Sequence, residues 1–514
     1  MVSEQPVKKE TKKKKKLSEG WILAISVILV VVVVFGTILG IRHYQQNQTV
    51  LTAGGKDVSV KEFNYFYNGV VNNFGSNASY LGIDTAAPLD EQKIDAEAVP
   101  MMSLMGLDSA LLDPYKKADG SYDVTWAGFF AEMAKESAVQ AYTVYQAATE
   151  AGFTVTDEVQ QAIDSELMNI QLYASIYGYD TDTFIENTYG RGCNEENYRE
   201  YLKVVNVASA YAAQLTYTDA EVTARYEKNP ENYDVVSYLV YTIKATDFMT
   251  QEEIDASKAA EGEEKKPNTE AMAEAKAAAE AMEKNFDATS DKVTAYADVT
   301  KANLNVTIEG AAEWMYETAK PGDIKLFEDA ENEAYYVVKL LENDNYASVN
   351  ALMIYIANDS EEEVSHEGHD HAEDEIPASE LPAADALKAV QDGLAADASE
   401  ESFRKLAETH NDSATLEITD AYYSTLLSNI SKDALLWVMD GQQAGAYATF
   451  ETAEGTFVLY FKGEGKPCRT LSVTSTLISE WMEKVTDEAL AVCNYDHEAA
   501  MNGGVGLVIG TQQG

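Results

Sequence analysis

Histidine and acidic side chains alternate in one short stretch and form the clearest group of metal-ligand atoms in the sequence. The segment 365–375 reads SHEGHDHAEDE and contains His366, His369 and His371. Imidazole nitrogens and carboxylate oxygens suit zinc, nickel or copper. The segment lies in a loop between a predicted strand and a predicted helix. Such a loop does not hold the three imidazoles in a fixed geometry around a metal ion. Two interpretations therefore stay open: a metal site at the three histidines, or a solvated acidic loop.

A second candidate for chemistry is the thiol of Cys193, which lies in GRGCNEEN next to Arg191. A neighbouring positive charge lowers the pKa of a thiol and makes it more nucleophilic. No histidine is close in sequence, and the chain has no G-x-S-x-G, H-E-x-x-H or P-loop motif. We therefore expect neither a hydrolase nor a cofactor. Three cysteines cannot form a disulfide framework, and one Cys468–Cys493 bridge or free thiols are the alternatives.

One long apolar stretch predicts on which side of a membrane the rest of the chain lies. From Ile22 to Ile41 there are twenty residues without charge, which as a helix span ~30 Å, the thickness of the bilayer core. The preceding residues contain Lys8, Lys9 and five consecutive lysines at 12–16. We therefore expect a single-pass anchor in the cell membrane, with a cytoplasmic N-terminus and the bulk of the chain outside. A cleaved signal peptide is the alternative, although its apolar region is usually shorter.

The composition indicates a folded, acidic, multidomain protein. The 514 residues carry a net charge of −48, and they exceed the size of one ordinary domain. Residues 1–44 hold eight basic and three acidic side chains, so the remainder holds 30 basic and 83 acidic ones. Such a surface repels nucleic acid, so no nucleic-acid partner is expected, and basic partners are favoured. The apolar content of 46% is enough for packed cores.

Helical periodicity dominates the chain up to residue 232. A short strand, a Gly54-Gly55 turn and a second strand precede it. Apolar residues then recur at three- and four-residue spacing, and Thr218-x-x-Glu221 forms a capping box. The main predicted helices cover 125–152, 156–178, 195–215 and 218–230.

Beyond residue 232 one pattern occurs twice. Strands are predicted at 235–243, 335–341, 349–356 and 456–461. Helices are predicted at 269–284, 292–300, 382–394 and 400–409, with a charged loop at 247–268. A constant offset of 123 residues relates Trp314, Gly322, Phe327 and Glu328 to Trp437, Gly445, Phe450 and Glu451. Four matches at one offset predict an internal repeat of an α+β module.

The order of these elements resembles the SurA/PrsA-type extracytoplasmic foldases, which belong to the parvulin-type peptidyl-prolyl isomerase family. The resemblance covers about 51–76 and 125–495. The passages that carry it are LTAGGKDVSVKEF (51–63), AGFTVTDEVQQAI (151–163), LTYTDAEVTARYEKNPENYD (215–234), KPGDIKLFE (320–328), EAYYVVKLL (333–341) and FRKLAETHNDSA (403–414).

The resemblance implies an α+β multidomain fold in which a C-terminal helix packs back on a helical chaperone domain like that of SurA. The implied parts are a basic cytoplasmic tail at 1–20, a transmembrane helix at 21–42, a helical chaperone-like domain at 51–232, parvulin-like modules at 233–345 and 346–467, a C-terminal helix at 468–502 and a flexible tail at 503–514.

The resemblance also points to candidate catalytic positions. Parvulin modules usually carry a histidine in the first strand and another in the last, facing each other across a cleft. This chain has Tyr238 and Tyr336 at these positions in the first module, and Leu352 or Met353 with Phe457 in the second. Phenol hydroxyls donate hydrogen bonds, so the two tyrosines are the candidates, with half-buried structural tyrosines as the alternative. The second module is expected to be inactive.

The function implied by the resemblance is that of a membrane-anchored bacterial chaperone. Its partners would be unfolded or partly folded exported polypeptides, and it would need no cofactor. Two alternatives stay open: an active isomerase working through the first module, and a cell-envelope scaffold that binds no unfolded chain.

Overall fold

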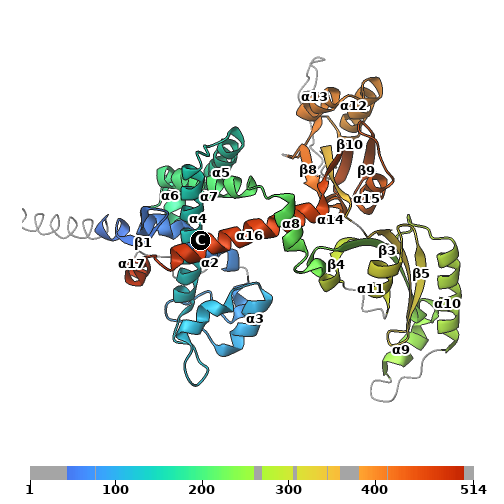
Figure 1. The fold of residues 1–514 in the computed structure, drawn as a ribbon, viewed down its shortest axis with the longest axis horizontal. Helices are drawn as coiled ribbons and strands as arrows, with labels where there is room; N and C mark the ends of the chain where they lie inside the picture. The colour runs from blue at the N-terminus through green and yellow to red at the C-terminus, as the bar shows by residue number, and fades with distance from the viewer. Residues whose placement is uncertain are drawn as a thin grey trace, which may run out of the picture. The chain divides into compact units, whose positions relative to one another are not determined.

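The protein folds into two compact units of mixed α and β structure (Figure 1). The first unit contains residues 1–215 and 478–514, and the second contains Thr216–Leu477. The structure is a computed structural model, and it describes residues 43–75, 77–259, 269–304, 310–343, 345–358, 381–413 and 415–502.

Four of the sequence-based predictions fall outside the described residues. They are the basic tail at 1–20, the anchor at 21–42, the histidine-containing segment 365–375 and the tail at 503–514. Within the part of the chain that the structure describes, no helix has the length and apolarity needed to cross a membrane.

The first unit is mostly helical, as the periodicity predicts. Its elements are β1 (Thr49–Ala53), β2 (Lys56–Ser59), α2 (Val60–Gly75), η1 (Ala78–Leu81), η2 (Ala96–Ala98), α3 (Val99–Leu104), η3 (Ser109–Tyr115), α4 (Trp126–Glu150), α5 (Asp157–Ile176), α6 (Thr181–Tyr189), α7 (Glu195–Ala213), the second half of α16 (Cys468–Leu490) and α17 (His497–Asn502).

A glycine turn fixes the start of this unit. Gly54 has a φ of 56°, and a Cβ atom there would lie 2.1 Å from the carbonyl oxygen of Tyr142 in α4. Only glycine fits such an approach, so the β1–β2 hairpin lies directly against α4. The core beneath it is aromatic, because Phe63, Phe129 and Phe130 are all fully buried.

The end of the chain returns to this hairpin, as predicted for the C-terminal helix. Trp481 of α16 packs edge-on against Tyr211 of α7, with ring centroids 6.1 Å apart. After the helix, the backbone nitrogen of Asp496 donates to the carbonyl oxygen of Val50 at 2.7 Å. The C-terminal segment therefore closes the core of the first unit, and the predicted packing is confirmed.

The second unit contains two α+β modules, preceded by α8 (Asp219–Tyr226) and η4 (Pro230–Asn232) and followed by the first half of α16. The first module has β3 (Val235–Lys244), η5 (Ala245–Phe248), α9 (Gln251–Ala259), α10 (Thr269–Lys284), β4 (Val293–Thr300), η6 (Lys301–Asn303), α11 (Ala311–Glu313), the π-helical turn η7 (Trp314–Thr318), β5 (Ile324–Asp329) and β6 (Ala334–Glu342). The second has β7 (Ala347–Ala357), α12 (Ala383–Ala396), α13 (Glu400–His410), β8 (Glu417–Ala421), α14 (Tyr423–Asn429), α15 (Lys432–Met439), β9 (Tyr447–Glu451) and β10 (Gly455–Pro467).

The two sheets have the same topology. The strand order is β4-β3-β6-β5 in the first module and β8-β7-β10-β9 in the second, and all described pairings are antiparallel. In the second module, α12 and α13 cover one face of the sheet, and α14 and α15 pack on the other. In the first module, α10 covers the equivalent face.

The repeat predicted from the offset of 123 residues is confirmed in detail. Trp314 contacts Phe327 edge-on at 5.6 Å, and Trp437 contacts Phe450 edge-on at 5.8 Å. The glycines that follow the two tryptophans have φ values of 93° and 94°. Each glycine nitrogen donates to a carbonyl oxygen of the last strand at 2.8 Å, that of Leu340 in the first module and its counterpart in the second.

Two local predictions are wrong. The segment predicted as a helix at 292–300 is strand β4, because its alternating Val293, Ala295 and β-branched residues pair with β3 along an edge of the sheet. Part of the predicted charged loop 247–268 is the short helix α9. In both cases tertiary contacts or local capping decide between conformations that periodicity alone leaves ambiguous.

Candidate functional site

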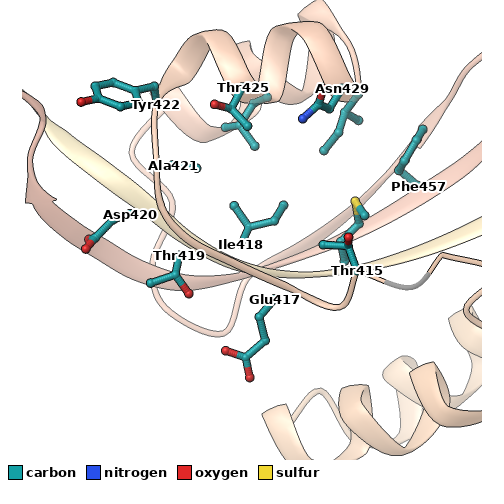
Figure 2. A pocket seen from close by; sticks show the side chains of 13 residues that line it. Thr415, Glu417, Ile418, Thr419, Asp420, Ala421, Tyr422, Thr425, Asn429 and Phe457 are labelled. Atoms are coloured by element: carbon teal, nitrogen blue, oxygen red, sulfur yellow. The ribbon is translucent and has the colours of Figure 1, made fainter. Parts of the chain in front are cut away.

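A cleft of about 540 Å³ lies in the second α+β module, between the sheet and α14 (Figure 2). Its apolar walls come from four elements: Met353 of β7, Ile418 of β8, Phe457 of β10, and Leu426 of α14 with Ile430 directly after that helix. Ile418 and Phe457 are only half-buried, so apolar surface faces solvent inside the cleft. This volume and lining are typical of a pocket that accepts one or two apolar groups.

Strand alternation decides which side chains of β8 enter the cleft. Figure 2 shows Ile418 directed toward α14, while Glu417 and Thr419 point to the other side of the strand. Asp420 has a φ of 49°, and its backbone nitrogen donates to Oδ1 of Asn350 at 2.8 Å. This left-handed residue interrupts the pairing and directs the chain from the sheet into α14.

The carboxylates near the cleft are engaged elsewhere. Glu417 forms an ion pair with Arg404 at 2.5 Å on the opposite side of the strand. Oδ1 of Asp420 accepts a hydrogen bond from the backbone nitrogen of Lys466 at 2.8 Å. Tyr422 points away in Figure 2, and burial raises its pKa to about 12, so this phenol is neutral.

The polar groups that do face the cleft are uncharged. Thr425 and Asn429 project from α14 over the apolar walls (Figure 2). A hydroxyl and an amide can donate hydrogen bonds to a peptide carbonyl, but neither serves as a general acid or base at neutral pH. The arrangement therefore suits binding of an apolar side chain with its flanking peptide.

Tyr238 and Tyr336, the predicted catalytic pair, lie on the same face of the first module's sheet but not opposite each other. Tyr238 pairs with Leu340, whereas Tyr336 pairs with Thr242. Four residue steps, ~13 Å, therefore separate the two tyrosines along the strands. The two tyrosines therefore do not face each other across the paired strands, although the resemblance had predicted that they would.

The surroundings of Tyr238 favour the structural alternative. Its side chain is fully buried, and its ring stacks on Tyr296 with centroids 5.1 Å apart. Burial raises the pKa of Tyr238, and among the described residues its hydroxyl has no hydrogen-bond partner. Because Tyr238 is fully buried, its hydroxyl is not accessible to a substrate in this conformation. Tyr336 is half-buried, and burial followed by the nearby Asp329 raises its pKa.

The strand registers show how the two modules differ at this face. Tyr238 pairs with Tyr296, and the equivalent pair in the second module is Ala351 with Ile418. A methyl group and a branched aliphatic chain thus replace two stacked rings. We infer that this difference in volume leaves room for the cleft in the second module.

The first-strand position predicted in the second module needs a correction, whereas Phe457 does lie at the position equivalent to Tyr336. The structure aligns Ala351, not Leu352 or Met353, with Tyr238, because β3 and β7 carry irregularities that shift the register. Leu352 faces the core beneath α12 and α13, whereas Met353 and Phe457 both line the cleft. The small side chain at position 351 was the sequence signal for an open face, but only the pairing identifies its counterpart.

Cys193 does not have the environment of a nucleophile. Its side chain is buried, and its thiol donates to the carbonyl oxygen of Lys61 at 3.4 Å. Burial raises the pKa of this thiol to about 12, so the expected effect of Arg191 is wrong. All three cysteines are free thiols.

The histidine-containing segment stays a prediction. His366, His369 and His371 lie outside the described residues, and among those described no cluster of histidine, cysteine or carboxylate side chains could hold a metal ion. Titration with zinc and nickel would test the three histidines directly.

Comparisons with known proteins assign no family to the chain. No protein-family model matches it, and a search of curated proteins finds no match either.

Proposed function

We propose that this chain is an extracytoplasmic foldase, tethered by the predicted helix at 21–42, that holds exported polypeptides through shallow apolar contacts. The observation that carries the proposal is the cleft over Met353, Ile418 and Phe457, which offers apolar surface with uncharged donors. A site of this kind recognises an apolar side chain, and many unfolded polypeptides expose apolar side chains. The resemblance of the repeated module to parvulin-type isomerases supports the same class of partner.

The experiment is suppression of aggregation. The full-length chain, in nanodiscs of zwitterionic lipid, is mixed with a reduced, unfolded secreted protein, and light scattering is followed with empty nanodiscs as the control. We expect scattering to fall as the molar ratio approaches one. No effect at several-fold excess, together with capture of one defined folded partner, would favour the scaffold alternative.

A second candidate is prolyl isomerisation in the second module, which the cleft favours over the first module. Rotation about an X-Pro bond needs an apolar pocket for the ring and donors that stabilise the twisted amide. Met353 and Phe457 supply the apolar pocket, and Thr425 and Asn429 supply the hydrogen-bond donors. Proline-limited refolding decides it: activity lost in Phe457→Ser but kept in Tyr238→Phe would support this site, and the reverse would assign activity to the first module.

A further inference from the structure

One surface of the first unit exposes a concentrated group of apolar side chains. Of the fourteen large apolar residues exposed among the described residues, six lie between 168 and 179. We call them the α5 stripe: Met168, Leu172, Tyr173, Ile176, Tyr177 and Tyr179. Apolar side chains exposed singly are ordinary, but a contiguous group of this size marks a binding surface.

The stripe is a second apolar face on α5 and not part of the core. The core face of the helix consists of Val159, Ile163, Leu167, Ile170 and Ala174. That face packs against Tyr198 and Leu202 of α7. In contrast, Met168, Leu172 and Ile176 recur every four residues and are between 57% and 67% exposed. Figure 1 shows α5 at the periphery of the first unit. Helical geometry gives the three a length of ~12 Å, enough for one or two turns of a bound helix.

The charge around the stripe indicates what covers it. Residues 151–190 hold seven acidic side chains and no lysine or arginine. One of the seven, Asp164, is paired with Arg199 at 3.0 Å, which leaves an acidic margin that includes Asp180 and Asp182 beside Tyr179. The C-terminal end of α5, where Ile176 lies, adds the negative end of a helix dipole.

This charge argues against a second copy of the chain as the occupant. A symmetric dimer would place the same patch of both copies face to face, and with it two acidic margins. A segment that carries lysine or arginine between apolar side chains would instead be attracted twice: its apolar side chains to the stripe and its positive charges to the acidic margin. Basic exported polypeptides contain such segments, in which lysine or arginine lies between apolar side chains.

We propose that the α5 stripe binds cationic apolar segments of polypeptides, as a site separate from the cleft of the second module. The proposal rests on the proposed function and names the class of client that the first unit selects. The stripe supplies apolar contact through Leu172 and Ile176, and the acidic margin supplies attraction and selectivity.

The test uses three labelled peptides of equal length and fluorescence anisotropy with the full-length chain in zwitterionic nanodiscs. One alternates leucine with lysine, one replaces each leucine by serine, and one replaces each lysine by glutamate. We expect only the first to bind at micromolar concentration, and to bind several-fold more weakly at 0.5 M salt, where exposed charges are screened. Equal binding of the serine peptide would reduce the site to non-specific attraction and overturn the proposal.

Matched variants locate the site. Leu172→Ser with Ile176→Ser should weaken binding of the leucine–lysine peptide at least tenfold. Leu104→Ser, at an 80% exposed leucine elsewhere in the first unit, should leave it unchanged. Both sites are exposed, so unchanged thermal unfolding is expected and serves as the folding control.

Two outcomes separate this inference from the proposed function. Unchanged peptide binding in the stripe variant would overturn the inference, and aggregation suppression that still depends on the second-module cleft would leave the proposed function standing. Sedimentation that shows a dimer dissociated by Leu172→Ser would instead assign the stripe to a second copy and also overturn it.

Discussion

Thr425→Trp should fill the cleft of the second module and weaken binding there about 30-fold, while leaving the fold intact. Thr425 is half-buried and projects from α14 over the apolar walls (Figure 2). Among the described residues the Thr425 hydroxyl makes no hydrogen bond, so the substitution breaks none there. A tryptophan ring has ~200 Å² of surface to bury, and the apolar walls can receive it.

The magnitude follows from what the ring displaces. A cleft of about 540 Å³ holds one or two apolar ligand groups, and burying one such side chain stabilises a complex by about 2 kcal/mol. Losing one contact of this size weakens binding about 30-fold. The matched control is Ser428→Trp, because Ser428 is exposed on the same helix and does not line the cleft.

The assay is anisotropy with an uncharged peptide that carries a single central Leu-Pro in a polar sequence, which lacks the lysines needed at the α5 stripe. We expect Thr425→Trp to lose most of the affinity and Ser428→Trp to keep it. Equal affinities in the two variants, with unchanged thermal unfolding, would refute the assignment of the cleft as a binding site.

Three further predictions concern stability and are measured by chemical denaturation. Phe450→Ala and Phe327→Ala should each destabilise their own module by about 3 kcal/mol, because each ring packs against the equivalent tryptophan; a large effect in only one module would contradict the repeat. Tyr238→Phe should leave stability unchanged or raise it by about 1 kcal/mol, since it removes a buried hydroxyl without a partner among the described residues, and a clear loss would reveal a contact outside them. Burial raises the pKa of Asp298, so its native carboxyl holds a proton more strongly than the unfolded one, and its unfavourable contribution develops as the pH rises above the unfolded value. Asp298→Asn keeps an acceptor for the backbone nitrogen of Ser424 and tolerates the φ of 55°, so the variant should gain stability relative to the parent between pH 4 and 7; an unchanged difference across that range would refute the burial argument.

Local patterns in the sequence were sufficient for most of the elements. The capping box at Thr218 and Glu221 forms as predicted, and so do the long helices of the first unit. The offset of 123 residues identified the repeat because its members fix local geometry: a tryptophan eight residues before a glycine with positive φ, then a phenylalanine in a strand.

The candidate site depends on how strands that are far apart in the sequence pair with each other. Hydrophobic periodicity does not reveal this pairing. Strand β4 was predicted as a helix because its neighbour β3 lies more than fifty residues away in sequence. The catalytic role predicted for Tyr238 required an accessible side chain, whereas Tyr238 is fully buried and stacks on Tyr296.

The sequence by itself determined the two copies of an α+β module, the helical first unit, the acidic surface and the apolar segment at 21–42, since each depends on residues close together in the chain. Only the tertiary structure decided that the second copy has the accessible cleft, that Glu417 and Asp420 turn away from it, and that the α5 stripe stays uncovered. These depend on strand register and on which side chains meet across the fold. A shift of one residue in register exchanges the two faces of a strand.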